Sequence, residues 1–372
     1  MRMLVFGTYD AARHPRIAVL TEGLRRHGAE IVECNVPLGL DTADRVAILR
    51  QPWRLPVLAG RIARSWRGLA RRARRLPPPD VVLVGYLGHF DVQLARRLFR
   101  HVPIVLDHLI GAADTARDRG VSGGITGGLL RRLDQAALRA ADIIVVDTDE
   151  HLTALPEPHR AKGVTVAVGA TEPWFAAAKA SGQAPRGTER PLRVVFFGLY
   201  TPLQGAPVIG AALRLLAGTR LEVTMIGSGQ DLVATRAAAS GTTADVHWLD
   251  WAEPADLPAL VARQDVCLGI FGTGRKATRV VPNKVFQGAA AGCAIITSDT
   301  APQRRMFGDA ALLIPPGNPD ALARALRMLA TDSELTARYR RAAAELAATK
   351  FSAEAVVAPL LDRLTTAEVI SR

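Results

Sequence analysis

The chain has 372 residues, of which 49% are hydrophobic and 22% are charged, and its formal net charge is +12. This length predicts roughly two to three domains, and the composition excludes a disordered protein. Its three cysteines are far apart and form no CxxC pair, which argues against a disulfide framework and against a structural zinc site.

Short apolar, β-branched runs alternate with segments of helical period along the whole chain. In the first half the strands are expected at 3–7, 29–34, 81–86, 103–107, 142–148 and 164–169, with helices near 16–27, 45–75, 90–101, 128–141 and 149–154. In the second half the strands are expected at 193–198, 221–227, 245–250, 265–272, 293–299 and 311–316. Helices near 205–217, 229–240, 255–263, 282–292, 302–307 and 319–331 separate them. Strands that are apolar throughout and separated by helices form parallel sheets covered on both faces, so we expect two doubly wound α/β domains.

The domain organisation follows from a loss of periodicity after the first series. We expect an N-terminal domain over 1–172, a linker rich in Pro, Gly and charge over 173–192, and a second domain over 193–348. Two further helical stretches, near 333–348 and 352–366, have no strand after them, and a C-terminal helix within 349–372 is expected to pack back on the first domain.

The net charge is uneven, since residues 1–190 hold 28 Lys and Arg against 19 Asp and Glu. The stretch 45–75 alone contains ten arginines and no acidic residue, with Trp and Leu between them. Two interpretations stay open: a segment that lies on an anionic membrane surface, or a helix that packs on the core and exposes a basic face. Nucleic acid is disfavoured, because no RRM-like, KH-like or helix-turn-helix signature accompanies the charge. The sequence has neither a signal-peptide pattern nor an apolar run of about 18 residues, so we expect a cytoplasmic protein, in one interpretation peripheral on the inner face of the membrane.

Residues that follow strands are the candidates for a site, because ligands of open α/β sheets bind beyond the carboxyl ends of the strands. In the second half, a turn over 198–205 opens a helix, and its free N–H groups can hold a diphosphate. It is not a GxGxxG fingerprint, so a nicotinamide enzyme is disfavoured. A second loop, 269–284, is rich in Gly and cations and leads into a helix at Pro282. With two domains, the space between their strand ends is the expected position of the site.

In the first half, polar residues follow three of the expected strands. Tyr9 and Asp10 follow the first strand and His89 follows the third. Asp107 and His108 stand at the end of the fourth. A His or Asp at such a position can bind or deprotonate a substrate hydroxyl, although any one of them can also be a capping or core residue.

These segments resemble the glycosyltransferases of the GT-B fold, close to glycosyltransferase family 4 (group 1). The similarity rests on FFGLYTPLQGAPVI, GSGQD, the stretch from LGIFGTGRK to CAIITSD and LLIPPGNPDALARAL in the second half, and on LDHLIGAADTARDRG and LDQAALRAADIIVVDTDEH in the first. It implies two Rossmann-like domains that face each other across a cleft. It also implies transfer of a hexosyl group from a nucleotide-diphosphate sugar to an acceptor hydroxyl, in a retaining reaction that needs no metal and no cofactor.

The resemblance assigns roles to the candidate residues. The sugar donor would be held by Gly198, Tyr200, Gln204, Gly205, Gly227, Gly229, Phe271, Gly272, Lys276, Arg279, Asn283, Lys284 and Gln287. Asp107, His108 and His89 would be catalytic. The acceptor would contact Gly7, Tyr9, Asp10, Arg16 and Asp114. The acceptor could be a lipid-linked sugar, a cell-envelope glycan or a small metabolite.

The sequence departs from the family pattern at four positions. Leu199 and Gln204 stand where family 4 commonly has Arg and Lys, and Arg279 and Gln287 stand where it has a pair of Glu residues. We expect the cationic loop over 275–284 to offset the two missing cations. Two alternatives stay open: an NDP-sugar 2-epimerase of the same fold, and a sugar-nucleotide-binding protein without catalysis.

Overall fold

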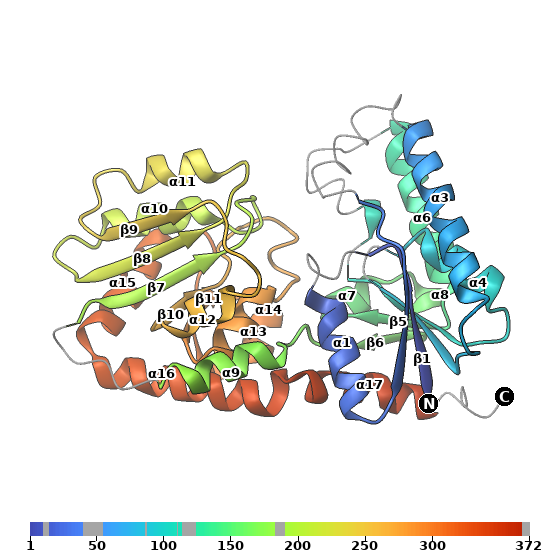
Figure 1. Ribbon diagram of the computed structural model, residues 1–372. Helices are drawn as coiled ribbons and strands as arrows, with labels where there is room; N and C mark the ends of the chain where they lie inside the picture. The colour runs from blue at the N-terminus through green and yellow to red at the C-terminus, as the bar shows by residue number, and fades with distance from the viewer. Residues whose placement is uncertain are drawn as a thin grey trace. The chain divides into compact units, whose positions relative to one another are not determined.

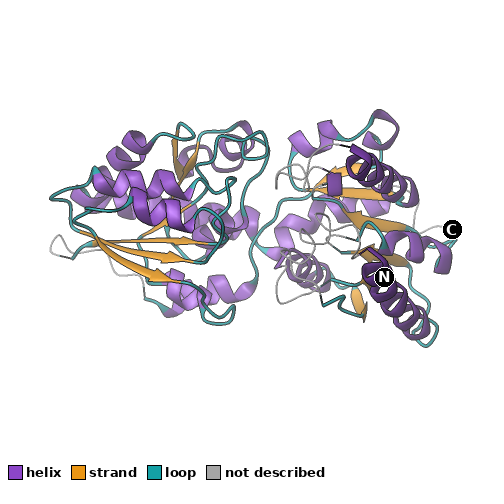
Figure 2. Cartoon of the chain, turned by 90° about the horizontal axis from the view of Figure 1, so that it is seen from above, coloured by secondary structure: helices purple, strands orange, loops and turns teal. Residues whose placement is uncertain are grey.

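The computed structural model describes residues 1–9, 15–39, 55–85, 88–109, 111–113, 124–182 and 190–366. The chain divides into two compact units: unit 1 comprises Met1–Ala167 and Val356–Arg372, and unit 2 comprises Val168–Ala355. Each unit is built on one parallel sheet with helices packed against it (Figures 1 and 2). The described residues contain all twelve predicted strands, so the predicted α/β class with two doubly wound domains is confirmed.

Unit 1 has a sheet in the order β2-β1-β3-β4-β5-β6. Its strands are β1 (Arg2–Gly7), β2 (Glu30–Asn35), β3 (Val81–Val84), β4 (Ile104–Asp107), β5 (Ile143–Val146) and β6 (Gly163–Thr165). Its helices are α1 (Pro15–Arg26), α3 (Leu55–Ala73), α4 (Asp91–Leu98), α6 (Gly124–Ala140), α7 (Asp149–Ala154) and α8 (Glu157–Arg160). Leu4 and Phe6 of β1 pack into one core cluster with residues of α3, α4 and α6, while α1 lies against the other face (Figure 1).

Unit 2 has a sheet in the order β12-β11-β10-β7-β8-β9. Its strands are β7 (Leu192–Phe197), β8 (Leu221–Ile226), β9 (Asp245–Leu249), β10 (Val266–Leu268), β11 (Ala294–Ser298) and β12 (Ala311–Ile314). Its α-helices are α9 (Glu172–Ala180), α10 (Ala206–Arg214), α11 (Leu232–Ala238), α12 (Leu257–Ala262), α13 (Asn283–Ala290), α14 (Ala301–Phe307), α15 (Pro319–Thr331) and α16 (Ser333–Leu346). A 3-10 turn, η2 (Gly308–Ala310), precedes β12, and a π-helical turn, η3 (Ala347–Phe351), follows α16. The last helix, α17 (Ala353–Thr366), belongs to unit 1 from Val356 onward.

The segment predicted as a linker, 173–192, differs from expectation. It contains most of α9, which packs on α12 and α13 of unit 2. Trp174 is buried and stacks on Phe197 with the ring centroids 5.8 Å apart. This stacking holds a segment whose Pro, Gly and Ser content is typical of a loop, so the division between the units lies before α9 rather than after 172.

The basic stretch 45–75 is described only from residue 55 onward, where it forms α3. Its apolar side faces the core: Leu69 is fully buried, and the indole N–H of Trp66 donates to Asp91. Arg61, Arg64 and Arg67 are exposed. None of the described helices is long and apolar enough to cross a membrane.

Candidate functional site

The strand order places the candidate site of unit 2. β10 and β8 lie on opposite sides of β7, so the connections that leave β7 and β10 run to opposite faces of the sheet. A crevice forms at such a switch point, beyond the carboxyl ends of the two strands, and it is where open α/β sheets bind ligands. The two loops predicted to hold the sugar donor, 198–205 and 269–284, begin at these two strand ends.

Glycines bring these two loops into direct contact. Gly205 adopts a left-handed conformation (φ 62°), and a Cβ there would lie 2.4 Å from the backbone nitrogen of Gly272. A Cβ on Gly272 would in turn lie 2.4 Å from the carbonyl oxygen of Pro202. The N–H of Phe271 donates to the carbonyl of Gln204 at 2.9 Å. No side chain fits where the two loops cross, so their backbones are in direct contact at this point.

The loop after β8 joins the same assembly. Gly227 and Gly229 have φ values of 121° and 150°, and a Cβ on either residue would overlap the backbone of Gly198 or Tyr200. The N–H of Tyr200 donates to the carbonyl of Ser228 at 2.9 Å. The loops after β10, β7 and β8, which are neighbours in the sheet, therefore present closely packed backbone at the carboxyl ends of these strands.

Lys284 connects α13 to the first of these loops. Its ammonium donates to the amide oxygen of Gln204 at 2.5 Å and lies 3.6 Å from the ring centroid of Phe196. It also approaches Gly198, where an added Cβ would be 3.2 Å away. Only 4% of Lys284 is exposed, and burial lowers the pKa of its ammonium to about 7.

The cationic segment before α13 is anchored by apolar residues. Ala277 and Val280 are buried with Ile270 in a small cluster, whereas Arg275 is exposed, and Lys276 and Arg279 are half-buried. Pro282 precedes the first residue of α13 in an extended conformation. The buried residues therefore fix the backbone of this segment, while its cationic side chains remain accessible to solvent.

Four other residues predicted to hold the sugar donor are placed differently. Tyr200 and Phe271 are fully buried in the core of unit 2, so their side chains act in packing and only their backbone lies at the loops. The order of apolar and polar residues along these loops does not predict that the two aromatic side chains are buried. Gln287 is buried on α13, and Asn283, the first residue of that helix, is half-buried.

In unit 1, Asp107 lies at the end of β4 and forms a buried ion pair with Arg16. The guanidinium Nε of Arg16 is 3.3 Å from Oδ1, and the same side chain donates to the carbonyls of Val166 and Ala167. Burial raises the pKa of Asp107, and Arg16 partly offsets this rise. Oδ2 of Asp107 is buried without a hydrogen-bond partner among the described residues. The guanidinium of Arg16 thus binds groups of its own unit, and one carboxylate oxygen of Asp107 has no hydrogen bond to a described residue.

His108 and His89 lie together, as the sequence suggested. Their rings meet edge to face with centroids 5.2 Å apart, and His89 is 3.4 Å from a carboxylate oxygen of Asp134 on α6. Burial, His89 and His151 lower the pKa of His108 to about 3, and its Nδ1 is buried without a partner among the described residues. A neutral imidazole of this kind can hydrogen-bond a hydroxyl but is a weak base.

The structure contains a second His–Asp pair that the sequence pattern did not indicate. Nδ1 of His151, on α7, is 2.5 Å from Oδ1 of Asp147, which directly follows β5. The i, i+4 spacing of an Asp at a strand end and a His in the next helix is the signal that could have indicated it.

At the carboxyl end of β1, several groups bind the carboxylate of Asp91, a residue that was not predicted to belong to the site. Asp91 accepts from the backbone N–H of Thr8 at 2.7 Å, from its hydroxyl at 2.8 Å and from the indole of Trp66 at 3.0 Å. A Cβ on Gly7 would lie 3.2 Å from this carboxylate. Asp10 and Asp114, two predicted acceptor contacts, lie outside the described residues.

The comparisons with known proteins agree with this architecture. Residues 191–332, most of unit 2, match the family model described as Glycosyl transferases group 1. No curated protein matches the chain.

Solved structures with the same fold cover nearly the whole chain. HepE from Anabaena, in complex with UDP-glucose, is 16% identical with a TM-score of 0.68 and covers 98% of this chain and 100% of its own. Sucrose-phosphate synthase from Thermosynechococcus elongatus is 13% identical with a TM-score of 0.71, over 98% of this chain and 99% of its own. A UDP-forming trehalose-phosphate synthase from Burkholderia vietnamiensis is 16% identical with a TM-score of 0.66, over 97% and 96%. Residues 191–332 thus match the group 1 glycosyltransferases, and the chain as a whole has the GT-B fold.

Proposed function

We propose that unit 2 binds a nucleotide-diphosphate sugar at the loops 198–205, 227–231 and 269–284, and that its sugar is transferred to an acceptor hydroxyl. The observation that carries this proposal is the convergence of closely packed, glycine-rich backbone and a buried ammonium at the switch point of the sheet. Backbone N–H groups, a helix N-terminus and fixed cations stabilise a departing diphosphate, which is the main requirement of this reaction.

Lys284 explains how the site could work without the two cations that the family commonly has in the loop 198–205. Gln204 stands at one of those positions, and its amide oxygen contacts the ammonium of Lys284. The positive charge missing from the loop is thereby supplied from α13 at nearly the same place. Because an amide does not neutralise the ammonium, the charge remains available to a phosphate.

In unit 1 we propose that Asp107 and His108 hold the acceptor hydroxyl, with His89 beside them. Each of the first two has a buried polar atom without a partner in the described part of the chain, which a ligand hydroxyl could satisfy. Arg16 then acts as the residue that positions Asp107, and Gly7 and Tyr9 remain proposed acceptor contacts.

We further propose that the reaction retains the anomeric configuration and needs neither metal nor cofactor. The cations of Lys276, Arg279 and Lys284 would carry the charge stabilisation that a metal supplies elsewhere. The stereochemistry is read from the product by NMR: a product of inverted configuration contradicts this part.

The exposed arginines of α3 support a peripheral contact with an anionic membrane. The apolar side of α3 is used by the core, so we propose that this contact is electrostatic, through Arg61, Arg64 and Arg67, rather than by insertion of Trp66. An acceptor linked to a lipid would then be the favoured class.

The test is donor binding and turnover by the purified protein. Calorimetry with a panel of NDP-sugars, UDP-sugars first because the solved HepE structures contain UDP or UDP-glucose, should show binding, followed by slow release of NDP. Lys276→Ala with Lys284→Met should abolish release, whereas Lys179→Ala with Lys350→Ala, two exposed lysines of the same unit, should not. Unchanged donor binding in the first double variant contradicts the site. Binding without transfer to any acceptor supports a non-catalytic protein, and epimerised donor supports an epimerase.

A further inference from the structure

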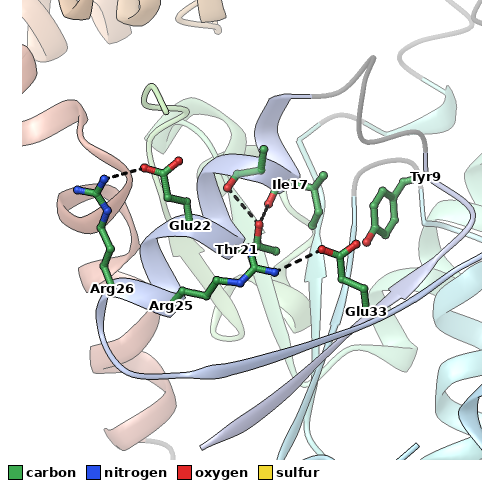
Figure 3. Close-up of a pocket in the computed structure, with 8 residues that line it drawn as sticks. Tyr9, Ile17, Thr21, Glu22, Arg25, Arg26 and Glu33 are labelled. Carbon is green, nitrogen blue, oxygen red and sulfur yellow. Dashed lines mark hydrogen bonds and ion pairs between the residues drawn. The ribbon is translucent and has the colours of Figure 1, made fainter. Parts of the chain in front are cut away.

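Unit 1 contains a pocket of about 500 Å³ in which Tyr9 is the one lining residue that the proposed reaction uses. It lies between α1 and β2, the strand at the edge of the sheet, with Tyr9 among its lining residues (Figure 3). Its volume is within the range of ~300–1,000 Å³ that is usual for small-molecule sites.

The charged groups around the pocket neutralise one another. Glu22 pairs with Arg26 at 3.1 Å, and Arg25 pairs with Glu33 at 3.5 Å. Two carboxylates and two guanidiniums carry no net charge, so the pocket favours neither an anion nor a cation. It offers strong hydrogen-bond acceptors and strong hydrogen-bond donors side by side.

Tyr9 brings a buried phenol to the pocket. Only 4% of this residue is exposed, and its hydroxyl interacts with the carboxylate of Glu33. Burial, with Glu33 nearby, raises the pKa of Tyr9, so the phenol stays protonated and can donate. Figure 3 shows the hydroxyl end of Tyr9 turned toward Glu33. The phenol oxygen and the Glu33 carboxylate keep further acceptor positions, which a ligand hydroxyl can use.

We propose that this pocket is a subsite for a neutral, polyhydroxylated group, that is, a saccharide. Sugar hydroxyls both donate and accept, so they suit carboxylates, guanidiniums and a phenol in one pocket. The apolar wall formed by Ile17 and Ala18 suits the C–H face of a pyranose ring. Saccharide binding in this pocket does not depend on the proposed function, which decides only whether the saccharide is the acceptor or a glycan held outside the reaction.

The test uses methyl α-glucoside, methyl α-mannoside, maltose and sucrose as probes, with saturation-transfer NMR and calorimetry on the full chain. We expect binding by the wild type, and about tenfold weaker binding by Tyr9→Phe and by Glu33→Gln, because each removes one hydrogen bond to the ligand. Glu157→Gln is the matched control: it removes an exposed carboxylate that pairs with Arg160 in the same unit, and binding should not change.

Two results would overturn the inference. One is that no probe binds although UDP does, and the other is that both pocket variants bind the probes as the wild type does. Melting curves show whether each variant is folded. Saccharide binding in a protein that fails to bind any NDP-sugar would leave the subsite in place and contradict the proposed function alone. A probe that is glycosylated in the presence of donor is the acceptor, and one that binds without being modified is a glycan held outside the reaction.

Discussion

Replacing Lys284 by Met tests two things: how burial of its ammonium affects the free energy of unfolding, and whether the ammonium binds the sugar donor. Burial lowers the pKa of the ammonium from 10.5 to about 7, while the unfolded chain keeps the ordinary value. Between these two pH values the unfolded state binds more protons than the folded state, so the free energy of unfolding rises with pH. Integrated from pH 7 to pH 9, this single group contributes a rise of about 2 kcal/mol.

In Lys284→Met this contribution is absent, so the difference in unfolding free energy between the variant and the wild type should shift by about 2 kcal/mol from pH 7 to pH 9, in favour of the wild type. Urea denaturation of both proteins at the two pH values measures it. The same variant should bind NDP-sugar roughly 10- to 100-fold more weakly, as expected for loss of one charge-assisted hydrogen bond. If the difference in unfolding free energy between the two proteins does not change with pH, the lowered pKa of Lys284 is refuted.

Three further predictions concern the loops, the surface and the metal. Gly205→Ala should destabilise the protein by more than about 2 kcal/mol, because the new Cβ meets backbone, whereas Gly218→Ala, at φ 76° with nothing within 4 Å, should cost only the backbone strain of about 1–2 kcal/mol; equal losses in melting experiments would contradict the close crossing of the loops. Replacing Arg61, Arg64 and Arg67 by Gln should reduce flotation with anionic vesicles, by about 1 kcal/mol per charge, without affecting neutral vesicles; unchanged flotation would remove α3 from the membrane contact. EDTA should leave NDP release unchanged, and a loss that Mg²⁺ or Mn²⁺ restores would contradict the metal-free proposal.

The sequence predicted the sheets well because their strands are apolar throughout and bounded by turns. It predicted α9 poorly, since the interaction that stabilises this helix, Trp174 on Phe197, joins residues far apart in the chain. Propensity and composition report on local structure, whereas such contacts depend on the fold.

The candidate site shows the same limit. The sequence predicted that the cations of 275–284, Lys284 among them, would offset those missing near Gln204, but not that Lys284 would be buried in contact with the Gln204 amide. In unit 1 the polar residues at the end of β4 were predicted from their positions. The Asp147–His151 pair and the role of Asp91 depend on side-chain directions that the sequence does not give.

Hydrogen exchange with and without UDP tests the central claim most directly, since it reports where a nucleotide binds without requiring an acceptor. We predict that UDP slows exchange in the peptides covering 198–205, 227–231 and 269–284, and that Lys284→Met reduces this protection. Bound UDP that leaves these three segments unprotected, or that protects only peptides of unit 1, would contradict the account.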